Sequence, residues 1–449
     1  MIELLQRAAE AGPDRPAVVT DEYELPYGEL YLRARAVAAA LVAAEVSRFA
    51  VLDTDAAMVT ALLGGASLAG AEACQYPPTD DAAELAGLAE RFGHDVLVTR
   101  RTDLDLPGRL LHPAGLLAAD GSAAPASPPT ERPLLVLTTG TTGTPRGVRH
   151  DWNRLLRSTK RIPPTPQQRW LLAYGLHQFA GLQILLHVFA AGATLVAPAP
   201  RRPREGLAAM RAHGVGFASA TPTYWRFLLA ELRADGGPVP PLQQITLGGE
   251  AIPGPLLDEI RQTFPDAKIS QVYAASEFGS SGSVRDGRSG LSLDVLSRGD
   301  DADVAMKIVD GQLWVRSRTG MLGYYGDPPT DPDAWRPTGD LVDIVDDRIV
   351  FRGRTSEVIN VGGVKVHPLP IEERVAAVPG VDMARVYGRP NAMTGAIVAV
   401  EVVAAPDADR ATIDQAIREA CADLPPASRP RSIKFVDSVT MAGNKIVRR

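Results

Sequence analysis

Cysteine is scarce in this chain of 449 residues. Only two occur, Cys74 and Cys421, and they lie far apart without the close spacing of metal ligands. Two such cysteines exclude a zinc knuckle, and they cannot build the framework of several bridges that stabilises small secreted proteins. We therefore expect both to be small buried apolar residues rather than reactive thiols.

The sequence also lacks a long apolar run, an excess of positive charge and a leader segment. The most apolar stretch, 182–197, contains Gln183 and His187 and is not apolar enough to span a bilayer. The formal net charge is −6, so a strongly basic face is not indicated and nucleic acid is not an expected partner. No basic and apolar leader opens the chain. We expect a soluble, cytoplasmic protein without a membrane partner.

The length and the pattern of apolar residues predict an α/β protein with at least two domains. A chain of 449 residues is too long for one ordinary hydrophobic core. Short apolar runs at 134–137, 193–196 and 244–247 have the length of buried strands and alternate with helical patterns. Helix, strand and helix are predicted near the N-terminus, with helical spacing at Leu30, Ala34, Val37 and Leu41. The segment 118–133, rich in Ala, Ser and Pro, is predicted to be a surface connection.

The pattern changes near Gly353. Residues 349–351 predict a strand that ends at 352–354, and a compact unit of about 95 residues follows, which is a plausible size for a small domain. Within this unit Pro370 stands where the first residue of a helix is expected. The apolar face of that helix would consist of Ile371, Val375 and Val378. We therefore expect one domain over residues 1–353 and a second over 354–449.

A loop rich in glycine and threonine follows the strand predicted at 134–137. Its sequence is Thr138-Thr139-Gly140-Thr141-Thr142-Gly143-Thr144-Pro145-Arg146-Gly147. Glycines let the backbone approach a ligand closely, and successive N–H groups can then point at anionic oxygens. The threonine hydroxyls can orient phosphate, and Arg146 adds a fixed positive charge. The loop is not a Walker-type motif, because the Gly-Lys-Ser/Thr ending is missing. Taken alone it predicts anion binding, with a flexible surface loop as the alternative.

Five further motifs follow the loop in order. They are Tyr273-Ala274-Ala275-Ser276-Glu277, Thr338-Gly339-Asp340, Gly353-Arg354, the segment 362–368 and Gly443-Asn444-Lys445-Ile446. Together with the loop, this set resembles the acyl-adenylate-forming superfamily of acyl- and aryl-CoA synthetases, adenylation domains of nonribosomal peptide synthetases and firefly luciferase. The resemblance covers roughly residues 130 to 449. It implies a large N-terminal domain of stacked β-sheets and helices, and a small mobile α+β C-terminal domain.

The resemblance implies that the chain joins a carboxylate to the α-phosphorus of ATP and releases pyrophosphate. The loop, including Thr138, Thr139, Gly140, Thr141, Thr142 and Gly143, would hold the β- and γ-phosphates, with Arg146 as its cation. Glu277 would hold Mg²⁺, a hard cation that prefers carboxylate and phosphate oxygens. Ser276 would contact the α-phosphate. Lys445 would bridge the carboxylate and ATP and stabilise the charge that develops between them.

The same resemblance assigns the rest of the nucleotide and the movement of the small domain. Tyr273 would stack on adenine, Asp340 would accept hydrogen bonds from the ribose hydroxyls, and Arg354 would contact the ribose. Ser356 lies at the hinge about which the small domain would rotate between half-reactions. Gly363 would then face the tunnel for the thiol. Taken alone, each of these residues also has an ordinary structural interpretation. Their occurrence together and in order favours roles in ATP binding and catalysis.

The chain departs from the family pattern at four of these positions, of which Ser276 in place of Thr keeps the hydroxyl. Arg146 replaces the usual lysine, which keeps the charge but exchanges a point charge for a planar fork. Ala274 replaces a glycine beside the acyl pocket, and the added methyl should narrow that pocket. Ser356 stands where the family more often has Asp or Lys.

The acid substrate is indicated by fewer residues. The segment His177-Gln178-Phe179-Ala180-Gly181 resembles one that lines the acyl site, and Gly248, Gly249 and Ala274 are further candidates for the pocket. Tyr224, Trp225 and Glu250 are also candidates for the wall of the acyl pocket. Gln178 stands where amino-acid-activating domains have an Asp, and a buried ammonium without a carboxylate partner is costly. We expect a small aromatic or compact acid; His177 could equally be an ordinary hydrogen-bonded residue.

The expected cofactors and partners are ATP, Mg²⁺ and CoA, in a monomer or homodimer. The alternative acceptors are the phosphopantetheine arm of a carrier protein acting in trans, or another nucleophile. A second alternative is a degenerate nucleotide binder without catalysis, which only Arg146 and Ser356 support.

Overall fold

The computed structural model describes residues 1–138, 145–299, 301–405, 408–442, 445–446 and 448, and only the backbone of 441, 442 and 445. The predicted phosphate-loop residues Thr139, Gly140, Thr141, Thr142 and Gly143 therefore lie outside the described residues, as does the side chain of Lys445. Among the described helices, none is long and apolar enough to cross a membrane.

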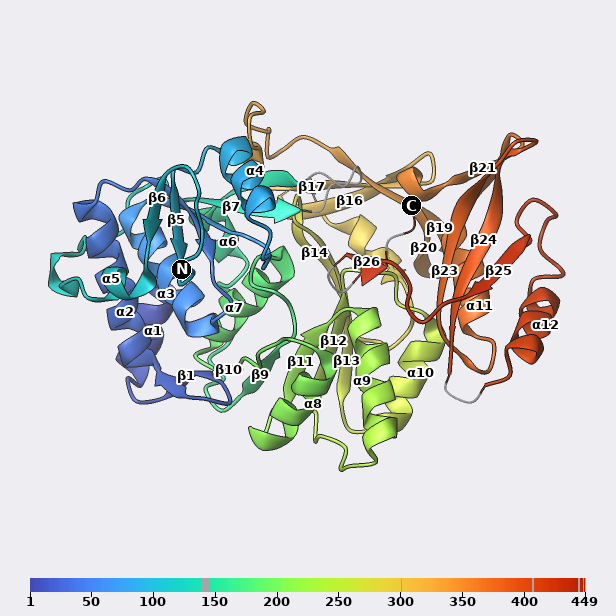
Figure 1. Cartoon of the computed structure of the whole chain (residues 1–449), viewed down its shortest axis with the longest axis horizontal. Coiled ribbons are helices and arrows are strands. Elements are labelled where there is room, and N and C mark those ends of the chain that lie inside the picture. The colour runs from blue at the N-terminus through green and yellow to red at the C-terminus, as the bar shows by residue number, and fades with distance from the viewer. Residues whose placement is uncertain (139–144, 300, 406–407, 443–444, 447, 449) are drawn as a thin grey trace.

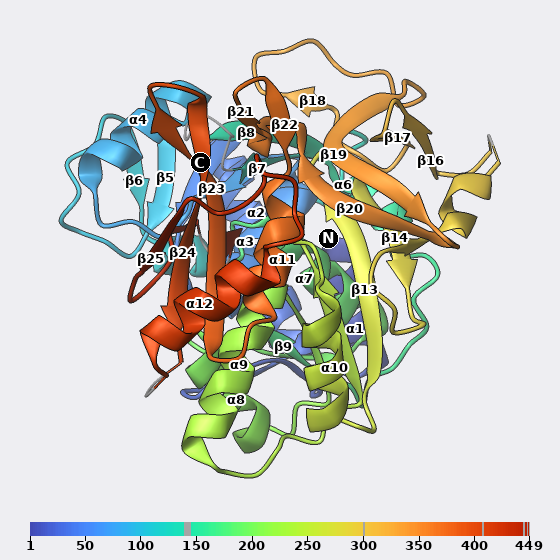
Figure 2. The same cartoon turned by 90° about the vertical axis from the view of Figure 1, so that its right-hand side faces the viewer.

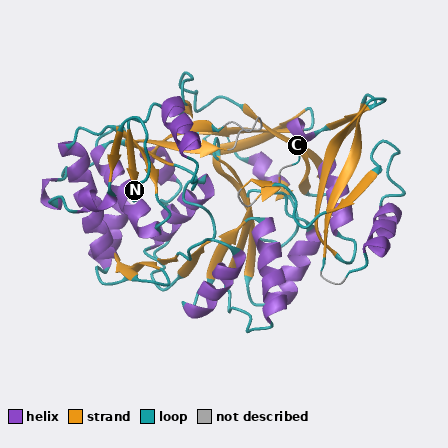
Figure 3. Ribbon diagram, in the orientation of Figure 1, coloured by secondary structure: helices purple, strands orange, loops and turns teal. Residues whose placement is uncertain are grey.

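Two largely parallel sheets build most of the chain before residue 285 (Figures 1 and 3). The first has the order β14 (Gly279–Val284), β13 (Lys268–Ala275), β12 (Gln244–Gly248), β11 (Phe217–Ala220), β9 (Arg169–Leu172), β10 (Thr194–Val196), β1 (Pro16–Val19), β2 (Glu24–Pro26). The second has the order β18 (Gly323–Tyr324), β8 (Arg146–Asp151), β7 (Pro133–Thr138), β4 (Glu72–Gln75), β3 (Arg48–Leu52), β5 (Val96–Thr99), β6 (Arg109–Leu111). In both sheets the antiparallel pairs lie toward the ends of the order.

Helices fill the space between these sheets and cover their outer faces. One hydrophobic core joins strands of both sheets through α1 (Ile2–Ala11), α2 (Tyr27–Ala43), α3 (Ala56–Ala69) and α7 (Phe179–Ala191). A second core packs α8 (Pro203–Ala212), α9 (Pro222–Asp235) and α10 (Gly254–Thr263) on the first sheet. A third packs α4 (Ala82–Phe92) on the second sheet. The short helices are α5 (Pro113–Leu117) and α6 (Trp152–Arg157).

A third, antiparallel sheet leads into the C-terminal unit. Its order is β15 (Leu291–Ser292), β20 (Arg348–Arg354), β19 (Arg336–Val345), β17 (Gln312–Ser317), β16 (Val304–Val309). The C-terminal unit has its own core around a sheet of β22 (Val364–Val366), β21 (Ile359–Val361), β24 (Gly395–Ala404), β23 (Val381–Asn391) and β25 (Ser432–Phe435). Its helices are α11 (Pro368–Ala376) and α12 (Arg410–Ala420) (Figure 2). The chain then returns to the middle of the molecule with β26 (Met441–Ala442) and β27 (Lys445–Ile446) (Figure 1).

The structure confirms the predicted strands with small changes of boundary. The run at 134–137 is β7, the run at 244–247 is β12, and the strand expected at 193–196 begins at Thr194. The helix expected to begin at Pro370 begins at Pro368 and ends at Ala376, so Val378 lies beyond it although its side chain is still buried. Helix formation starts earlier because Pro368, whose fixed φ suits the first helical turn, precedes Pro370. Both cysteines are buried and unpaired, as expected.

Candidate functional site

A solvent-open cleft lies just beyond the end of β12 and beside the second half of β13; the space within it, open solvent included, is about 460 Å³. Its walls come from residues 250–252, 271–273, 289–291 and Val350 and Phe351 of β20, with Glu373 of α11 on the side of the C-terminal unit. Ligands of α/β proteins commonly bind outside the carboxyl ends of parallel strands, because the connecting loops there form a crevice. The position of this cleft follows that rule.

Backbone geometry at Gly248 and Gly249 directs the chain from the end of β12 into the cleft wall. A Cβ atom on Gly248 would lie 3.0 Å from the Val272 carbonyl oxygen on the neighbouring strand. Gly249 has a φ of 84°, a conformation that L side chains rarely adopt. The chain therefore turns sharply at the end of β12 and delivers the next residue, Glu250, to the cleft.

Tyr273 lines this cleft, and hydrogen bonds join it to Asp340 and, through Asp340, to Arg354. The Tyr273 hydroxyl donates to Asp340 Oδ2 at 2.5 Å, and Arg354 Nε donates to Asp340 Oδ1 at 3.1 Å. Asp340 and Arg354 face each other in the β19–β20 register. The Tyr273 ring stacks on Phe351 with centroids 5.2 Å apart. Burial and the Asp340 carboxylate raise the pKa of Tyr273 well above its ordinary value, so its hydroxyl stays a donor.

A second group links the described end of the phosphate loop to Glu277. The Tyr324 hydroxyl donates to Glu277 Oε1 at 3.0 Å. The Arg146 guanidinium lies 3.4 Å above the centre of the Tyr324 ring and 3.9 Å from Asp327. Burial first, and the Glu277 carboxylate second, raise the pKa of Tyr324 to about 12. Thr138 lies opposite Arg146 in the β7–β8 register.

These residues fit a magnesium ion that is held jointly with a nucleotide. Among the described residues, no group of three or more His, Cys, Asp or Glu side chains could hold a metal ion. Mg²⁺ with nucleotides needs only one or two carboxylates, because phosphates and waters supply the other oxygens. Glu277, at the turn after β13 and oriented by Tyr324, offers such a carboxylate.

The predicted acyl-site residues lie at the start of α7. Gln178 is the N-cap residue, and its Oε1 accepts a hydrogen bond from Gly175 N at 3.0 Å. Burial first, and the charge of Arg201 second, lower the pKa of His177 to about 4, so its ring is neutral at pH 7. Neither residue lines the 460 Å³ cleft. The structure therefore does not bring these two residues into the cleft wall that Tyr273 lines.

Nearby, His150 of β8 is buried and stacks on Phe179 at 5.0 Å. Both ring nitrogens of His150 are fully buried. Burial lowers its pKa to about 3. Ser276, predicted to contact the α-phosphate, lies beside this ring. The sequence analysis missed His150, because a single histidine in a strand carries no signal of its own.

The remaining predicted positions have varied environments. Ala274 pairs with Ser280 next to a register shift between β13 and β14. Ser356 is exposed in a short 3₁₀ turn, Thr355–Glu357. Gly363, with a φ of 88°, lies in the exposed β21–β22 turn and donates its N–H to Asn360 Oδ1 at 2.9 Å. Tyr224 and Trp225 are fully buried in the hydrophobic core of the first sheet.

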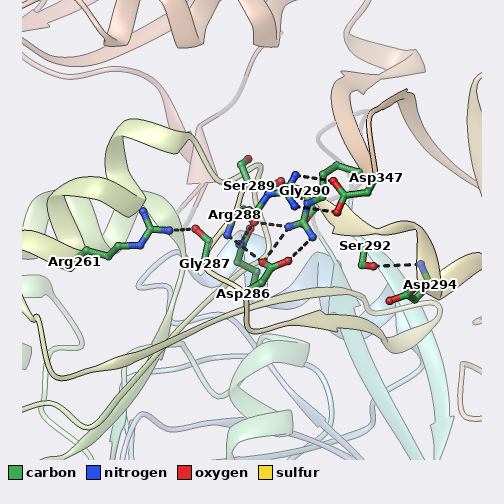
Figure 4. Close-up of polar contacts among 11 residues, drawn as sticks. Arg261, Asp286, Gly287, Arg288, Ser289, Gly290, Ser292, Asp294 and Asp347 are labelled. Carbon is green, nitrogen blue, oxygen red and sulfur yellow. Dashed lines mark hydrogen bonds and ion pairs between the residues drawn. The ribbon is translucent and has the colours of Figure 1, made fainter.

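A polar network that the sequence did not reveal builds the far wall of the cleft. The buried Arg348 guanidinium contacts Asp286 through two nitrogens, at 2.7 and 3.2 Å. It also donates to the carbonyl oxygens of Arg288, Ser289 and Gly290, at 2.6, 3.2 and 2.9 Å. Figure 4 shows how Asp286 and residues 288–290 gather around this point. Arg348 thereby fixes the loop whose residues 289–291 line the cleft.

Comparisons with known proteins agree with the site and the fold. The chain matches the family described as AMP-binding enzyme over residues 5–325, and the AMP-binding enzyme C-terminal domain over residues 370–445. It is 26% identical over 340 residues to 3-[(3aS,4S,7aS)-7a-methyl-1,5-dioxo-octahydro-1H-inden-4-yl]propanoyl:CoA ligase of Mycobacterium tuberculosis, covering 72% of this chain and 66% of that ligase. It is 25% identical over 427 residues to 2-succinylbenzoate–CoA ligase of Bacillus velezensis, covering 88% and 86%. The chain spans only 62% and 33% of the length of two other curated relatives.

Solved structures share the whole fold. The anthranilate CoA ligase AuaEII in complex with anthranoyl-AMP superposes with a TM-score of 0.86 over 99% of this chain and 95% of that chain, at 19% identity. The o-succinylbenzoate CoA synthetase of Bacillus subtilis in complex with its acyl-adenylate superposes with a TM-score of 0.80 at 22% identity, over 99% and 96%. The predicted architecture, a large N-terminal part of stacked sheets and helices and a small α+β C-terminal part, is confirmed.

Proposed function

Because the chain belongs to the AMP-binding enzyme family, we propose that it uses MgATP to activate a carboxylic acid as an acyl-AMP and then transfers the acyl group to the thiol of CoA. The hydrogen-bonded group of Tyr273, Asp340 and Arg354, of which Tyr273 lines the cleft, carries the proposal. This group places an aromatic ring, a carboxylate and a guanidinium together, and these suit the base, the ribose hydroxyls and the phosphates of a purine ribonucleotide.

In this proposal the cleft binds the adenosine half of ATP. The adenine lies against the side of the cleft that Tyr273 lines, since the ring already stacks on Phe351 and is held in place by its hydroxyl. Asp340 accepts from the ribose hydroxyls, because a carboxylate has about four acceptor positions and the protein contacts described here use two. Arg354 adds positive charge next to the ribose and the phosphates.

The phosphate half faces the end of β7 and Glu277. Thr138, the loop 139–143 and Arg146 hold the β- and γ-phosphates, and Ser276 contacts the α-phosphate. Glu277 would hold Mg²⁺, which would neutralise phosphate charge. A carboxylate oxygen of the acid attacks the α-phosphorus and pyrophosphate leaves. Lys445 stabilises the charge between the two anionic reactants, which would otherwise repel each other.

The second half-reaction would require the small unit to move. We place the domain boundary at 353/354, since the cores of the first part use residues up to Phe351 and the next core begins at Ile359. Rotation about Ser356 would remove Lys445 and bring the Gly363 turn to the cleft. The thiol would attack the acyl carbonyl, lose its proton to solvent or a base, and expel AMP.

We propose a small aromatic or compact acid as substrate. The Gln178 side-chain oxygen already accepts from Gly175 N, and a neutral amide does not balance an α-ammonium. The methyl group of Ala274 would narrow the acyl side of the site, and His177, whose ring is neutral at pH 7, would add no charge there. The similarity to ligases named for 2-succinylbenzoate and anthranilate supports an aromatic acid.

The test is ATP–pyrophosphate exchange with a panel of aromatic, short-chain and amino acids, with Mg²⁺ present. At least one aromatic or short-chain acid should support exchange; no exchange with any acid, with folded protein, refutes the proposal in favour of a non-catalytic nucleotide binder. Mass spectrometry of the product with CoA, beside a carrier-loading assay, then decides the acceptor. Lys445→Ala should abolish exchange but leave thioester formation from supplied acyl-AMP intact.

A further inference from the structure

The C-terminal tail makes two polar contacts just after Lys445, one at Ile446 and one at Arg448. The backbone N–H of Ile446 donates to Glu250 Oε1 at 3.3 Å. Two residues later, Arg448 pairs with Glu372 of α11. The Ile446 side chain is buried against Met383 and Val439. The backbone of Lys445 itself forms β27 with that of Ala442.

The Arg448–Glu372 pair is the stronger of the two attachments. Arg448 Nε and Nη2 donate to the two oxygens of Glu372 at 3.0 and 2.6 Å, a bidentate arrangement. The side chains are only 16% and 9% exposed. Glu372 Oε2 also accepts from Val386 N at 3.1 Å, and Arg448 Nη1 lies 3.9 Å from Glu357. All of these partners follow residue 354, so the pair ties the tail to its own unit.

Glu250 belongs to the other unit and is itself held firmly. Its Oε2 accepts from both the N–H and the hydroxyl of Thr223, at 3.0 and 2.7 Å, in the first turn of α9. Its Oε1 is left to receive the tail. Glu250 also lines both the nucleotide cleft and a second cavity of about 360 Å³, whose wall includes Arg226, Glu372 and Arg448.

From this arrangement, and resting on the proposed function, we propose that Arg448, Glu372 and Glu250 are positioning residues for Lys445. The Arg448–Glu372 pair fixes the tail on the small unit in every state of the enzyme. Glu250 completes the placement only while the tail lies over the nucleotide cleft. Since β27 leads directly from Lys445 to Ile446, a shift of the tail moves the lysine by a similar distance. A misplacement of about 1 Å can cost about 100-fold in rate.

The test separates the two half-reactions in Arg448→Met and Glu250→Gln. Both variants should form acyl-AMP about 100-fold more slowly at saturating ATP and acid, and both should form thioester from supplied acyl-AMP at the wild-type rate. Arg448→Lys should recover part of the lost rate. The control is Arg418→Met, which breaks an exposed ion pair with Asp414 on α12 and should change neither half-reaction. Wild-type acyl-AMP formation in Arg448→Met, or equal loss of both half-reactions in a folded variant, would overturn the inference.

A second measurement does not depend on activity. Amide hydrogen exchange of the peptide around Ile446 should become faster in Arg448→Met and Glu250→Gln, and stay unchanged in Arg418→Met. If the wild-type protein activates no acid, the proposed function fails, whereas faster exchange in these variants still supports the two attachments. Unchanged exchange in both variants refutes the attachments themselves, whatever the activity.

Discussion

Arg348→Met should loosen the wall of the nucleotide cleft and destabilise the protein. Methionine keeps much of the side-chain volume but removes every contact of the guanidinium, two to Asp286 and three to backbone carbonyls. Arg348 is 5% exposed in its side chain, whereas Asp286 is 40% exposed and can regain water. Breaking a fully buried pair costs about 3–5 kcal/mol. Because Asp286 can rehydrate, we expect about 2–4 kcal/mol of unfolding free energy.

The effect on nucleotide binding follows from the same contacts. Without Arg348, the loop 288–290 loses the donors that fix it, and residues 289–291 line the cleft. Gln271 still donates to the Arg288 carbonyl at 2.5 Å, so the loop should loosen rather than unfold. We expect the KM for ATP to rise about tenfold, which corresponds to about 1.4 kcal/mol. The kcat should change less, because the phosphate side of the site is untouched.

Arg288→Met is the matched control in the same network. Arg288 pairs with Asp347 at 2.6 and 2.9 Å (Figure 4), but both side chains are more than half exposed. Exposed pairs contribute less than about 1 kcal/mol. The assays are denaturant unfolding and the ATP dependence of pyrophosphate exchange. If Arg348→Met and Arg288→Met behave alike in both, the reasoning from burial and from the loop contacts is wrong.

Three further predictions concern the phosphate side and its neighbour His150. Arg146→Lys loses the stacking on Tyr324, which is worth about 0.5–1 kcal/mol for an exposed cation. The KM for ATP should therefore rise about two- to fivefold, and an unchanged KM would contradict this prediction. Tyr324→Phe removes a hydrogen-bond donor to the charged Glu277, which is worth about 1.5–3 kcal/mol. A Mg²⁺ titration at fixed ATP should show that the Mg²⁺ concentration for half-maximal exchange rises at least tenfold. The pKa of His150 is lowered from 6.5 to about 3, so the unfolded chain binds a proton that the folded chain does not, and stability is lost as pH falls from about 6.5 toward 3. His150→Leu should keep the contact with Phe179 and make this loss shallower, measured by denaturant unfolding at pH 7 and pH 5; the same slope as wild type refutes it.

The sequence predicts those residues of the candidate site that lie in motifs resembling the acyl-adenylate-forming superfamily. Tyr273 and Asp340 are 67 residues apart, yet the resemblance assigns both to one nucleotide site, and the structure joins them by a hydrogen bond. The boundaries of β7 and β12 were also predictable, since runs of buried apolar residues between turn residues have a strand's length.

The parts that were missed depend on contacts between distant segments without periodicity. Tyr324 reaches Glu277 across 47 residues, and Arg348 reaches Asp286 across 62. Neither side chain belongs to a repeating pattern, and an arginine after two aspartates is ordinarily a solvated turn residue. The surroundings of Arg146 were also not predictable. The sequence shows that arginine keeps the positive charge of the usual lysine, but only the structure shows that its guanidinium stacks on the Tyr324 ring.

The two attachments of the tail differ in strength, and this difference suits an enzyme that must use Lys445 in one half-reaction and withdraw it in the next. On its own unit the tail is held by a buried bidentate pair, whose disruption would cost about 3–5 kcal/mol. On the other unit, the hydrogen bond that the described residues show is that of Ile446 N to Glu250, at 3.3 Å, of the kind that contributes about 1.5–3 kcal/mol to a charged acceptor. Each 1.4 kcal/mol changes an equilibrium tenfold. A contact to Glu250 as strong as the Arg448–Glu372 pair would therefore shift the equilibrium toward the state with the small unit over the nucleotide by up to several hundredfold. This shift would slow thioester formation. Strengthening this contact should accordingly favour adenylation and impair transfer, whereas Glu250→Gln should slow adenylation and leave transfer unchanged.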